Sequence, residues 1–181
     1  MIIHEKHTLK NGMELTIITP GAVYAEQMVE FIKVVDEESL FLGRESRDKR
    51  RSVQETRDFF DAKLKSTNEA FCLGLINGEI AVEFFVLPTS NRVRFAHRSL
   101  CGLVVLKKYW GMGIGRLAVK KCIDLSKQLG YEQLELVTNT QNEAAISLYK
   151  NLGFEICGNL KNAMKYADGS YADEFAMVTY F

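Results

Sequence analysis

The sequence has no surplus of charge of either sign and no long apolar run. Its 23 lysines and arginines are balanced by 23 aspartates and glutamates, whereas a protein that binds nucleic acid generally carries a basic excess. No apolar run approaches the roughly 20 residues that a membrane span requires. The first residues also lack the basic start and the long apolar stretch of a secretory signal. We therefore expect a cytoplasmic protein with no nucleic-acid or membrane partner.

Cysteine and histidine are too few and too scattered to suggest a metal site or a disulfide framework. The four cysteines lie far apart, form no Cys-x-x-Cys pair and have no metal-ligand spacing to the three histidines. All four stand among apolar residues, so we expect reduced and buried side chains at Cys72, Cys101, Cys122 and Cys157. No bound metal ion is expected.

Proline-rich linkers, internal repeats and low-complexity tracts are also missing. The 181 residues include two prolines, and the length is that of one ordinary domain. Hydrophobic residues make up 47% of the sequence, which is enough to bury one sizeable core. We expect residues 1–181 to form a single domain.

Hydrophobic periodicity predicts a strand and two helices in the first third of the chain. Residues 14–19 alternate polar and apolar side chains, as a strand does, and residues 22–35 have apolar positions at helical spacing. The segment 43–52 is dense in charge and is interpreted as a solvated loop. Ser52 could then cap a second helix, with Glu55 as the other half of a capping box.

The pattern changes to that of strands from residue 71 onward. Apolar runs at 71–76 and 80–87 flank Asn77-Gly78, a dipeptide that favours a tight hairpin because both residues tolerate positive φ. A longer strand is expected over 93–106, and a helix over 115–129.

The end of the chain predicts a strand at 134–137, a short helix at 143–151 and a closing strand at 174–180. The order is strand, two helices, an antiparallel meander, a right-handed strand-helix-strand crossover, helix and strand. This order predicts a three-layer α/β/α domain with a mixed, mostly antiparallel central sheet.

A glycine-rich turn between a strand and a helix is the most informative segment. Gly111, Gly113 and Gly115 follow an apolar strand, and without a Cβ the backbone can curl tightly and approach a ligand closely. The N–H groups at the helix start carry partial positive charge, so the turn can cradle a pyrophosphate. A tight turn without a ligand would give the same pattern. A P-loop is excluded because Arg116-Leu117 stands where a Lys-Ser/Thr pair is required, and the spacing does not fit a dinucleotide fold.

The turn resembles the acetyl-CoA-binding motif of the GNAT acetyltransferases, Gln/Arg-x-x-Gly-x-Gly/Ala. Gly113 and Gly115 match the two small positions, and Trp110 stands where the family usually has Gln or Arg. This departure removes one polar contact and leaves the backbone cradle intact.

A second segment is similar to the family's later motif, Asn-x-x-Ala-x-x-Leu-Tyr-x-x-x-Gly-Phe. The positions that match in register are Asn142, Ala145, Leu148, Tyr149, Gly153 and Phe154. Two motifs in the right order are far more specific than either alone, and the resemblance covers roughly residues 71–181. From the residues alone, Asn142 is a helix N-cap and Tyr149 is a core side chain. The resemblance implies further that Asn142 touches the pantetheine arm and that Tyr149 is the general acid.

The resemblance implies a GNAT-like fold and an N-acetyltransferase. Such an enzyme moves an acetyl group from acetyl-CoA, without a metal, to a primary amine of a small molecule or protein in a ternary complex. The same resemblance allows a homodimer. It implies that backbone amides around residues 103–105 align the pantetheine and polarise the carbonyl. The cofactor-binding residues it implies are Leu103, Val104, Val105, Trp110, Gly111, Met112, Gly113, Ile114, Gly115, Arg116 and Asn142.

The general base, the acceptor and the acyl group are left open. Ser99 holds the strand position where members of the family often have a carboxylate, and it cannot serve as a base. His97 on the same strand face, Glu83 on the neighbouring strand and a water chain are the alternatives. The acidic stretch 36–38 either attracts a cationic amine or is a solvated helix end. A non-catalytic acyl-CoA-binding module, a transferase of another acyl group and a phosphotransferase are the competing functions.

Overall fold

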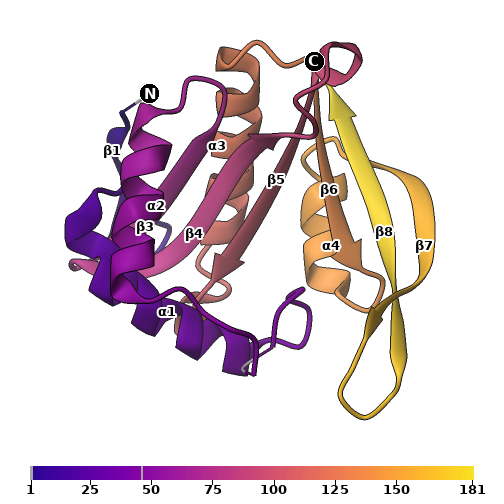
Figure 1. Cartoon of the computed structure of the whole chain (residues 1–181), viewed down its shortest axis with the longest axis horizontal. Coiled ribbons are helices and arrows are strands. Elements are labelled where there is room, and N and C mark those ends of the chain that lie inside the picture. Colours follow the sequence, from indigo (N-terminus) through magenta and orange to yellow (C-terminus); the bar gives the residue numbers. More distant parts are fainter. Residues whose placement is uncertain (1, 46) are drawn as a thin grey trace.

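A computed structural model of the chain describes residues 2–45 and 47–181, and in them eight strands form one sheet that four α-helices flank (Figure 1). In chain order these elements are β1 (His4–Thr8), β2 (Glu14–Ile18), α1 (Ala25–Glu38), α2 (Val53–Lys65), β3 (Ala70–Ile76), β4 (Glu79–Pro88), β5 (Arg98–Val105), α3 (Ile114–Gln128), β6 (Gln133–Asn139), α4 (Glu143–Lys150), β7 (Glu155–Lys165) and β8 (Tyr171–Tyr180). Met1 and Ser46, which the expected domain and charged loop include, lie outside the described residues.

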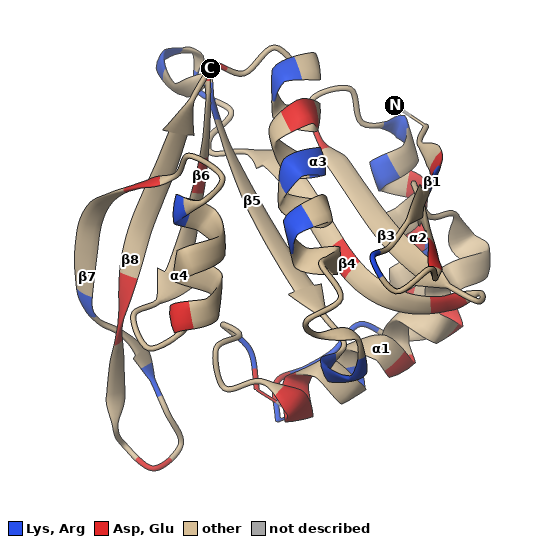
Figure 2. Ribbon diagram, turned by 180° about the vertical axis from the view of Figure 1, so that it is seen from behind, with Lys and Arg blue, Asp and Glu red and all other residues tan. Residues whose placement is uncertain are grey.

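The sheet has the strand order β1-β2-β3-β4-β5-β6-β8-β7. Neighbouring strands are antiparallel except β5 and β6, which are parallel because α3 crosses over between them. Helices α1 and α2 cover one face of the sheet, and α3 and α4 cover the other (Figure 1 and Figure 2). The predicted three-layer α/β/α arrangement with a mixed, mostly antiparallel sheet is therefore confirmed.

Two local predictions from the sequence are confirmed in atomic detail. The Ser52 side chain accepts a hydrogen bond from the Glu55 N–H at 3.2 Å, and the Glu55 carboxylate accepts one from the Ser52 N–H at 2.7 Å. This capping box starts α2. Asn77 and Gly78 have φ values of 50° and 82°, so they form the tight turn that joins β3 to β4.

Other elements differ from the sequence prediction, two of them because they lie at the edges of the sheet. The pattern does not predict β1 or most of β7, the two edge strands, whose outward faces need no apolar side chains. The strand expected over 93–106 is shorter, since Val93–Phe95 forms a turn of 3-10 helix and β5 begins at Arg98. Val93 is 91% exposed, so the alternation of polar and apolar residues there faces no core.

The four cysteines are free thiols, and one of them does not lie where we expect it. Cys72, Cys101 and Cys122 are buried as predicted, and burial raises the pKa of the Cys72 thiol to about 12. Cys157 is exposed. It lies on the edge strand β7, and its Sγ is 3.3 Å from the carbonyl oxygen of Ala176 on β8.

The centre of the sheet is split between its two parallel strands. β5 and β6 pair only over residues 98–100 and 133–135, although β5 continues to Val105 and β6 to Asn139. Beyond this short ladder the two strands diverge, while β5 stays paired with β4 and β6 with β8 (Figure 1). The gap between them positions the site described next.

Candidate active site

A cavity of about 1100 Å³ opens where β5 and β6 separate. It runs along the end of β5 and past the glycine turn to α4, and residues 41–44 after α1 line it as well. The two strands are parallel, so the segments that follow their carboxyl ends lie at the same end of the sheet. Segments far apart in the sequence therefore meet at this cavity. The predicted site residues that line the cavity are Leu103, Val104, Val105, Trp110, Gly111, Gly113, Ile114, Gly115, Arg116, Asn142 and Tyr149.

The glycine turn leaves the start of α3 open. Gly113 is the N-cap of α3 and has a φ of 84°, a left-handed conformation that L side chains rarely adopt. No described side chain caps this helix, and its first turn contains no acidic residue. The N–H groups of the first turn therefore keep their partial positive charge. A Cβ at Gly113 would meet nothing within 4 Å, which leaves room for a phosphate group.

Two other side chains of the turn point in different directions. The half-exposed Trp110 donates a hydrogen bond from its indole Nε1 to the Val105 carbonyl at 2.7 Å, which ties the turn to the end of β5. The sequence motif does not indicate this bond. Met112 lies outside the cavity lining. Its Sδ accepts a hydrogen bond of 3.5 Å from the Nδ2 of Asn11, in the turn between β1 and β2.

Helix α4 brings Asn142 and Tyr149 to the cavity. Asn142 is the N-cap, as predicted, and its side chain accepts a hydrogen bond from the Ala145 N–H at 3.2 Å. Tyr149 is 8% exposed, and its ring packs 5.8 Å from the Phe154 ring. Burial raises the pKa of the Tyr149 hydroxyl well above its usual range, with smaller contributions from the Cys101 and Cys122 thiols. Tyr149 therefore remains a proton donor throughout the neutral pH range.

The structure separates the three side chains considered for the general base. Ser99 is fully buried, and its Oγ lies 2.6 Å from the Ser126 Oγ and donates to the Gln133 carbonyl at 2.8 Å. His97 lies in a turn before β5 and outside the cavity lining, so the expectation that it shares a strand face is wrong. Glu83 on β4, opposite Val104, is the one of the three that lines the cavity.

Glu83 is a buried carboxylate without a partner. It is 7% exposed, and its Oε2 is fully buried with no hydrogen bond from the described residues. Burial raises the pKa of the Glu83 carboxyl above its usual value, and the nearby Arg44 and Arg51 oppose this effect. A carboxyl with a raised pKa is better matched to accept a proton from an amine near neutral pH than an ordinary glutamate.

The charged segment 43–52 is not simply the solvated loop that its composition suggests. Arg44 and Arg50 turn inward, and their Nε atoms donate to the two oxygens of Asp36 at 2.6 and 3.1 Å. The Asp36 side chain is completely buried at the end of α1. Asp36 is therefore not an exposed charge that draws in a cationic amine. The sequence carries no local sign of this ion-pair cluster because its members are 8 and 14 residues apart.

Two general observations bear on the kind of site. Across residues 2–45 and 47–181, no group of three or more His, Cys, Asp or Glu side chains is arranged to hold a metal ion. Of the helices described, none is both long enough and apolar enough to cross a membrane.

Comparison with known sequences gives one family. The model of the acetyltransferase (GNAT) family matches residues 31–154. N-alpha-acetyltransferase 30 of Schizosaccharomyces pombe is 33% identical over 78 residues, which is 43% of this chain and 49% of that protein. The L-amino acid N-acetyltransferase AaaT of Escherichia coli is 30% identical over 105 residues, which is 56% of this chain and 62% of that one. The chain thus spans about half to three fifths of the curated relatives it matches.

Solved structures share the fold over nearly the whole chain. A GNAT-family acetyltransferase from Streptococcus pneumoniae has a TM-score of 0.87 at 26% identity, covering 92% of this chain and 99% of that one. The putative acetyltransferase yncA from Salmonella typhimurium, solved with its cofactor acetyl-CoA, has a TM-score of 0.80 at 16% identity, with 92% and 93% of the chains covered.

Proposed function

The chain belongs to the GNAT acetyltransferase family, and from this premise we propose that it transfers an acetyl group from acetyl-CoA directly to a primary amine within a ternary complex. The observation that carries the proposal is the split between β5 and β6, which opens onto the uncapped start of α3. A separated strand edge and a free helix N-terminus suit the two ends of an acetyl-CoA molecule, a peptide-like arm and a pyrophosphate.

The backbone of β5 supports this proposal in detail. The Leu106 N–H donates to the Ala81 carbonyl on β4 at 2.9 Å. Because backbone groups alternate sides along an antiparallel pair, the N–H groups of Leu103 and Val105 point into the gap and that of Val104 points to β4. The Val105 carbonyl also points into the gap, and it already accepts a hydrogen bond from the Trp110 indole. We therefore expect the N–H groups of Leu103 and Val105 to bind the pantetheine arm and the thioester carbonyl.

The remaining side chains have roles that follow from their positions. Acetyl-CoA supplies an acyl group on a thiol, which is a good leaving group. Gly113, Gly115 and Arg116 at the start of α3 bind the pyrophosphate. Tyr149, on the α3 side of the sheet, keeps its proton at neutral pH and gives it to the departing sulfur. Glu83, on the α1 side, takes a proton from the acceptor ammonium.

Two alternatives stay open within this fold, a non-catalytic acyl-CoA-binding module and a transferase of another acyl group. A raised-pKa carboxylate and a protonated tyrosine in one cavity favour catalysis, because a module that only binds needs neither. A cytoplasmic location and a homodimer remain predictions from the sequence.

The test of the proposal has two parts. Calorimetry should detect acetyl-CoA binding well below a concentration of about 1 mM, with or without a chelator. A panel of amines should then reveal CoA release that depends on the amine, while acetyl-, propionyl- and succinyl-CoA are compared as donors. If acetyl-CoA does not bind, the proposal is wrong. If acetyl-CoA binds but no amine causes the release of CoA, the result would favour the non-catalytic module.

A further inference from the structure

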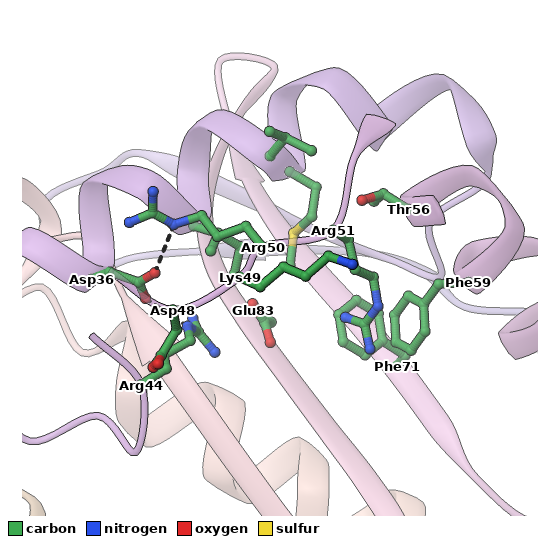
Figure 3. A pocket seen from close by; sticks show the side chains of 13 residues that line it. Asp36, Arg44, Asp48, Lys49, Arg50, Arg51, Thr56, Phe59, Phe71 and Glu83 are labelled. Carbon is green, nitrogen blue, oxygen red and sulfur yellow. Dashed lines mark hydrogen bonds and ion pairs between the residues drawn. The ribbon is translucent and has the colours of Figure 1, made fainter. Parts of the chain in front are cut away.

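A second and smaller cavity adjoins the acetyl-CoA cavity on the α1 side of the sheet. It measures about 320 Å³ and lies between α1, α2, β4 and the charged loop (Figure 3). Glu83 and Arg44 line both cavities. A molecule held here would therefore lie next to the carboxylate that takes the proton, so this cavity is where the acceptor amine enters.

The cavity contains cationic donors that are already oriented. Asp36 holds the Nε atoms of Arg44 and Arg50 at 2.6 and 3.1 Å. Each guanidinium retains an Nη2 that is buried and has no hydrogen-bond partner in the described chain. One carboxylate thus serves two guanidinium groups, which leaves positive charge and unused donors in a buried place. Buried donors without partners are costly, and a ligand carboxylate is the group that matches such a pair best.

The same cavity also contains a buried hydrogen-bond acceptor, a carboxylate oxygen of Glu83. The Glu83 Oε2 is buried and accepts no hydrogen bond from residues 2–45 or 47–181. Figure 3 shows Glu83 between the side chains of Arg44 and Arg51, the two cations whose charges act on it. A ligand that binds both the arginines and Glu83 needs a carboxylate for Arg44 and Arg50 and, close to it, an ammonium group for Glu83. These are the two charged groups of an α-amino acid.

The charge and the walls of the cavity narrow the class of acceptor further. Four cationic side chains and three anionic ones line the cavity, which disfavours a polyamine or another polycation. Met28, Ile32, Phe59 and Phe71 supply an apolar wall, and the Arg51 guanidinium lies 4.3 Å above the Phe59 ring. The volume is at the small end of the range of ligand pockets. It suits one amino acid with an apolar side chain.

We infer that the acceptor is a free α-amino acid with an apolar side chain, its carboxylate held by Arg44 and Arg50 and its amine by Glu83. This inference rests on the proposed acetyl transfer. In the reaction the amine nitrogen forms a bond to the acetyl carbon, and the thioester C–S bond breaks. One ammonium proton passes through Glu83 to solvent before the attack. The nitrogen loses a second proton as the amide forms, and this proton restores the hydroxyl of Tyr149, which has given its own proton to the thiolate.

The experiment compares acceptors that differ only in the carboxylate. CoA release is measured with L-methionine and L-phenylalanine and with their amides, which keep the amine and lack the negative charge. We expect kcat/KM to be at least about 100-fold higher for the free acids, the scale for leaving a buried charged site unpaired. Equal or better activity with the amides, or with dipeptides whose amine lies far from a carboxylate, would overturn the inference.

Variants of the arginines identify the site. Arg50→Gln should raise KM for the free acids at least about tenfold and should affect KM for the amides far less, because the amides carry no carboxylate. Arg50 does not line the acetyl-CoA cavity, so the affinity for acetyl-CoA should stay close to that of the wild type. Arg50→Lys keeps the charge next to Asp36 and should retain part of the difference. Arg47→Gln is the matched control, because Arg47 lies in the same loop, is 68% exposed and does not line the cavity. A KM for the acids that Arg50→Gln leaves unchanged would also overturn the inference.

A binding measurement separates this inference from the proposed transfer. Calorimetry with L-phenylalanine and its amide is carried out on the protein loaded with CoA, where no transfer is possible. Binding of the acid and not of the amide would support the amino-acid site even if no amine releases CoA. If acetyl-CoA is consumed with other amines and L-phenylalanine does not bind, the transferase stands and the amino-acid site does not exist.

Discussion

Glu83 differs from an ordinary buried glutamate because its Oε2 is buried and has no hydrogen-bond partner among the residues that the structure describes. Burial of a carboxylate costs free energy unless it is paired. The neighbouring arginines reduce this cost through their charge without bonding to the carboxylate. This arrangement fits the proposed role of Glu83, which is to bind the ammonium group of the acceptor and to take a proton from it.

Replacing Glu83 should change the pH dependence of the reaction as well as its rate. Burial raises the pKa of the Glu83 carboxyl above that of an ordinary glutamate. As the pH falls, Glu83 therefore becomes protonated, and ceases to be a base, at a higher pH than an exposed glutamate would. Wild-type kcat/KM should therefore decline on the acidic side of neutrality. Glu83→Gln should lower kcat by about 10²–10⁴-fold and abolish this decline. A variant that keeps both the rate and the acidic limb would exclude Glu83 as the base.

The same substitution should not destabilise the protein at neutral pH. A carboxyl whose pKa is raised on folding stabilises the folded state below its unfolded pKa, and this contribution is lost as the pH rises through the folded pKa. At pH 7, above the unfolded pKa, burial of the Glu83 carboxyl therefore opposes folding. Glu83→Gln should unfold in urea at the same or a higher concentration than the wild type, and its advantage should shrink toward pH 4. Marked destabilisation at pH 7 would mean that Glu83 has a structural partner.

Removing the Tyr149 hydroxyl should affect turnover more than binding. Tyr149→Phe keeps the ring that packs on Phe154 and removes only the proton donor. We expect kcat to fall by about 10²–10⁴-fold with little change in the acetyl-CoA dissociation constant. The loss should be smaller with acyl donors whose thiol is a better leaving group. An unchanged kcat, with chemistry limiting the rate, would show that another donor or water protonates the sulfur.

Individual elements show which parts of the fold a sequence can predict. The capping box of α2 and the Asn77-Gly78 hairpin involve residues next to one another in the chain, so local rules predict them well. The edge strands have no apolar face that a pattern could reveal. The segment around Val93 fails for the opposite reason: it alternates like a strand, but it forms a turn of 3-10 helix and Val93 is exposed.

The glycine turn permits a test with a control on the same helix. Gly113→Val should weaken acetyl-CoA binding at least about 100-fold, because the branched side chain fills the space beside the first N–H groups of α3. The left-handed φ of 84° at Gly113 also makes the variant less stable, by about 1–2 kcal/mol.

Gly130 separates these two effects. It has the same φ of 84°, also meets nothing within 4 Å, and lies at the far end of α3. Gly130→Val should lose similar stability and keep the wild-type dissociation constant, as measured by calorimetry. If both variants bind acetyl-CoA equally well, the turn has only a structural role.

For the molecule as a whole, two halves of the site differ in how far the sequence predicts them. The proposed acetyl-CoA side follows from two compact motifs, around Gly113 and around Asn142, whose residues line one cavity. The proposed acceptor side consists of Asp36, Arg44 and Glu83, which lie on a helix, a loop and a strand. Only the tertiary fold brings these three together, so no local pattern shows that they belong to one site.

Binding of acetyl-CoA should stabilise the whole fold, because the proposed site contacts β5 on one side of the split and β6 on the other. Ligand present at 100 times its dissociation constant should raise the free energy of unfolding by about 2.7 kcal/mol. Urea unfolding with and without acetyl-CoA measures this change, and a chelator should not alter it. A ligand effect that disappears with the chelator would point to a metal in the site.

The split between β5 and β6 also has a consequence for solubility. A sheet that divides along part of its length has two inner edges in addition to the outer edges at β1 and β7. Unpaired edges are the places where strands of other chains add on and aggregation begins. If acetyl-CoA binds in this split as proposed, bulges or charges that blocked the inner edges would also block the site. We therefore expect bound acetyl-CoA to cover these edges in place of a strand, and self-association to be greatest when acetyl-CoA is absent.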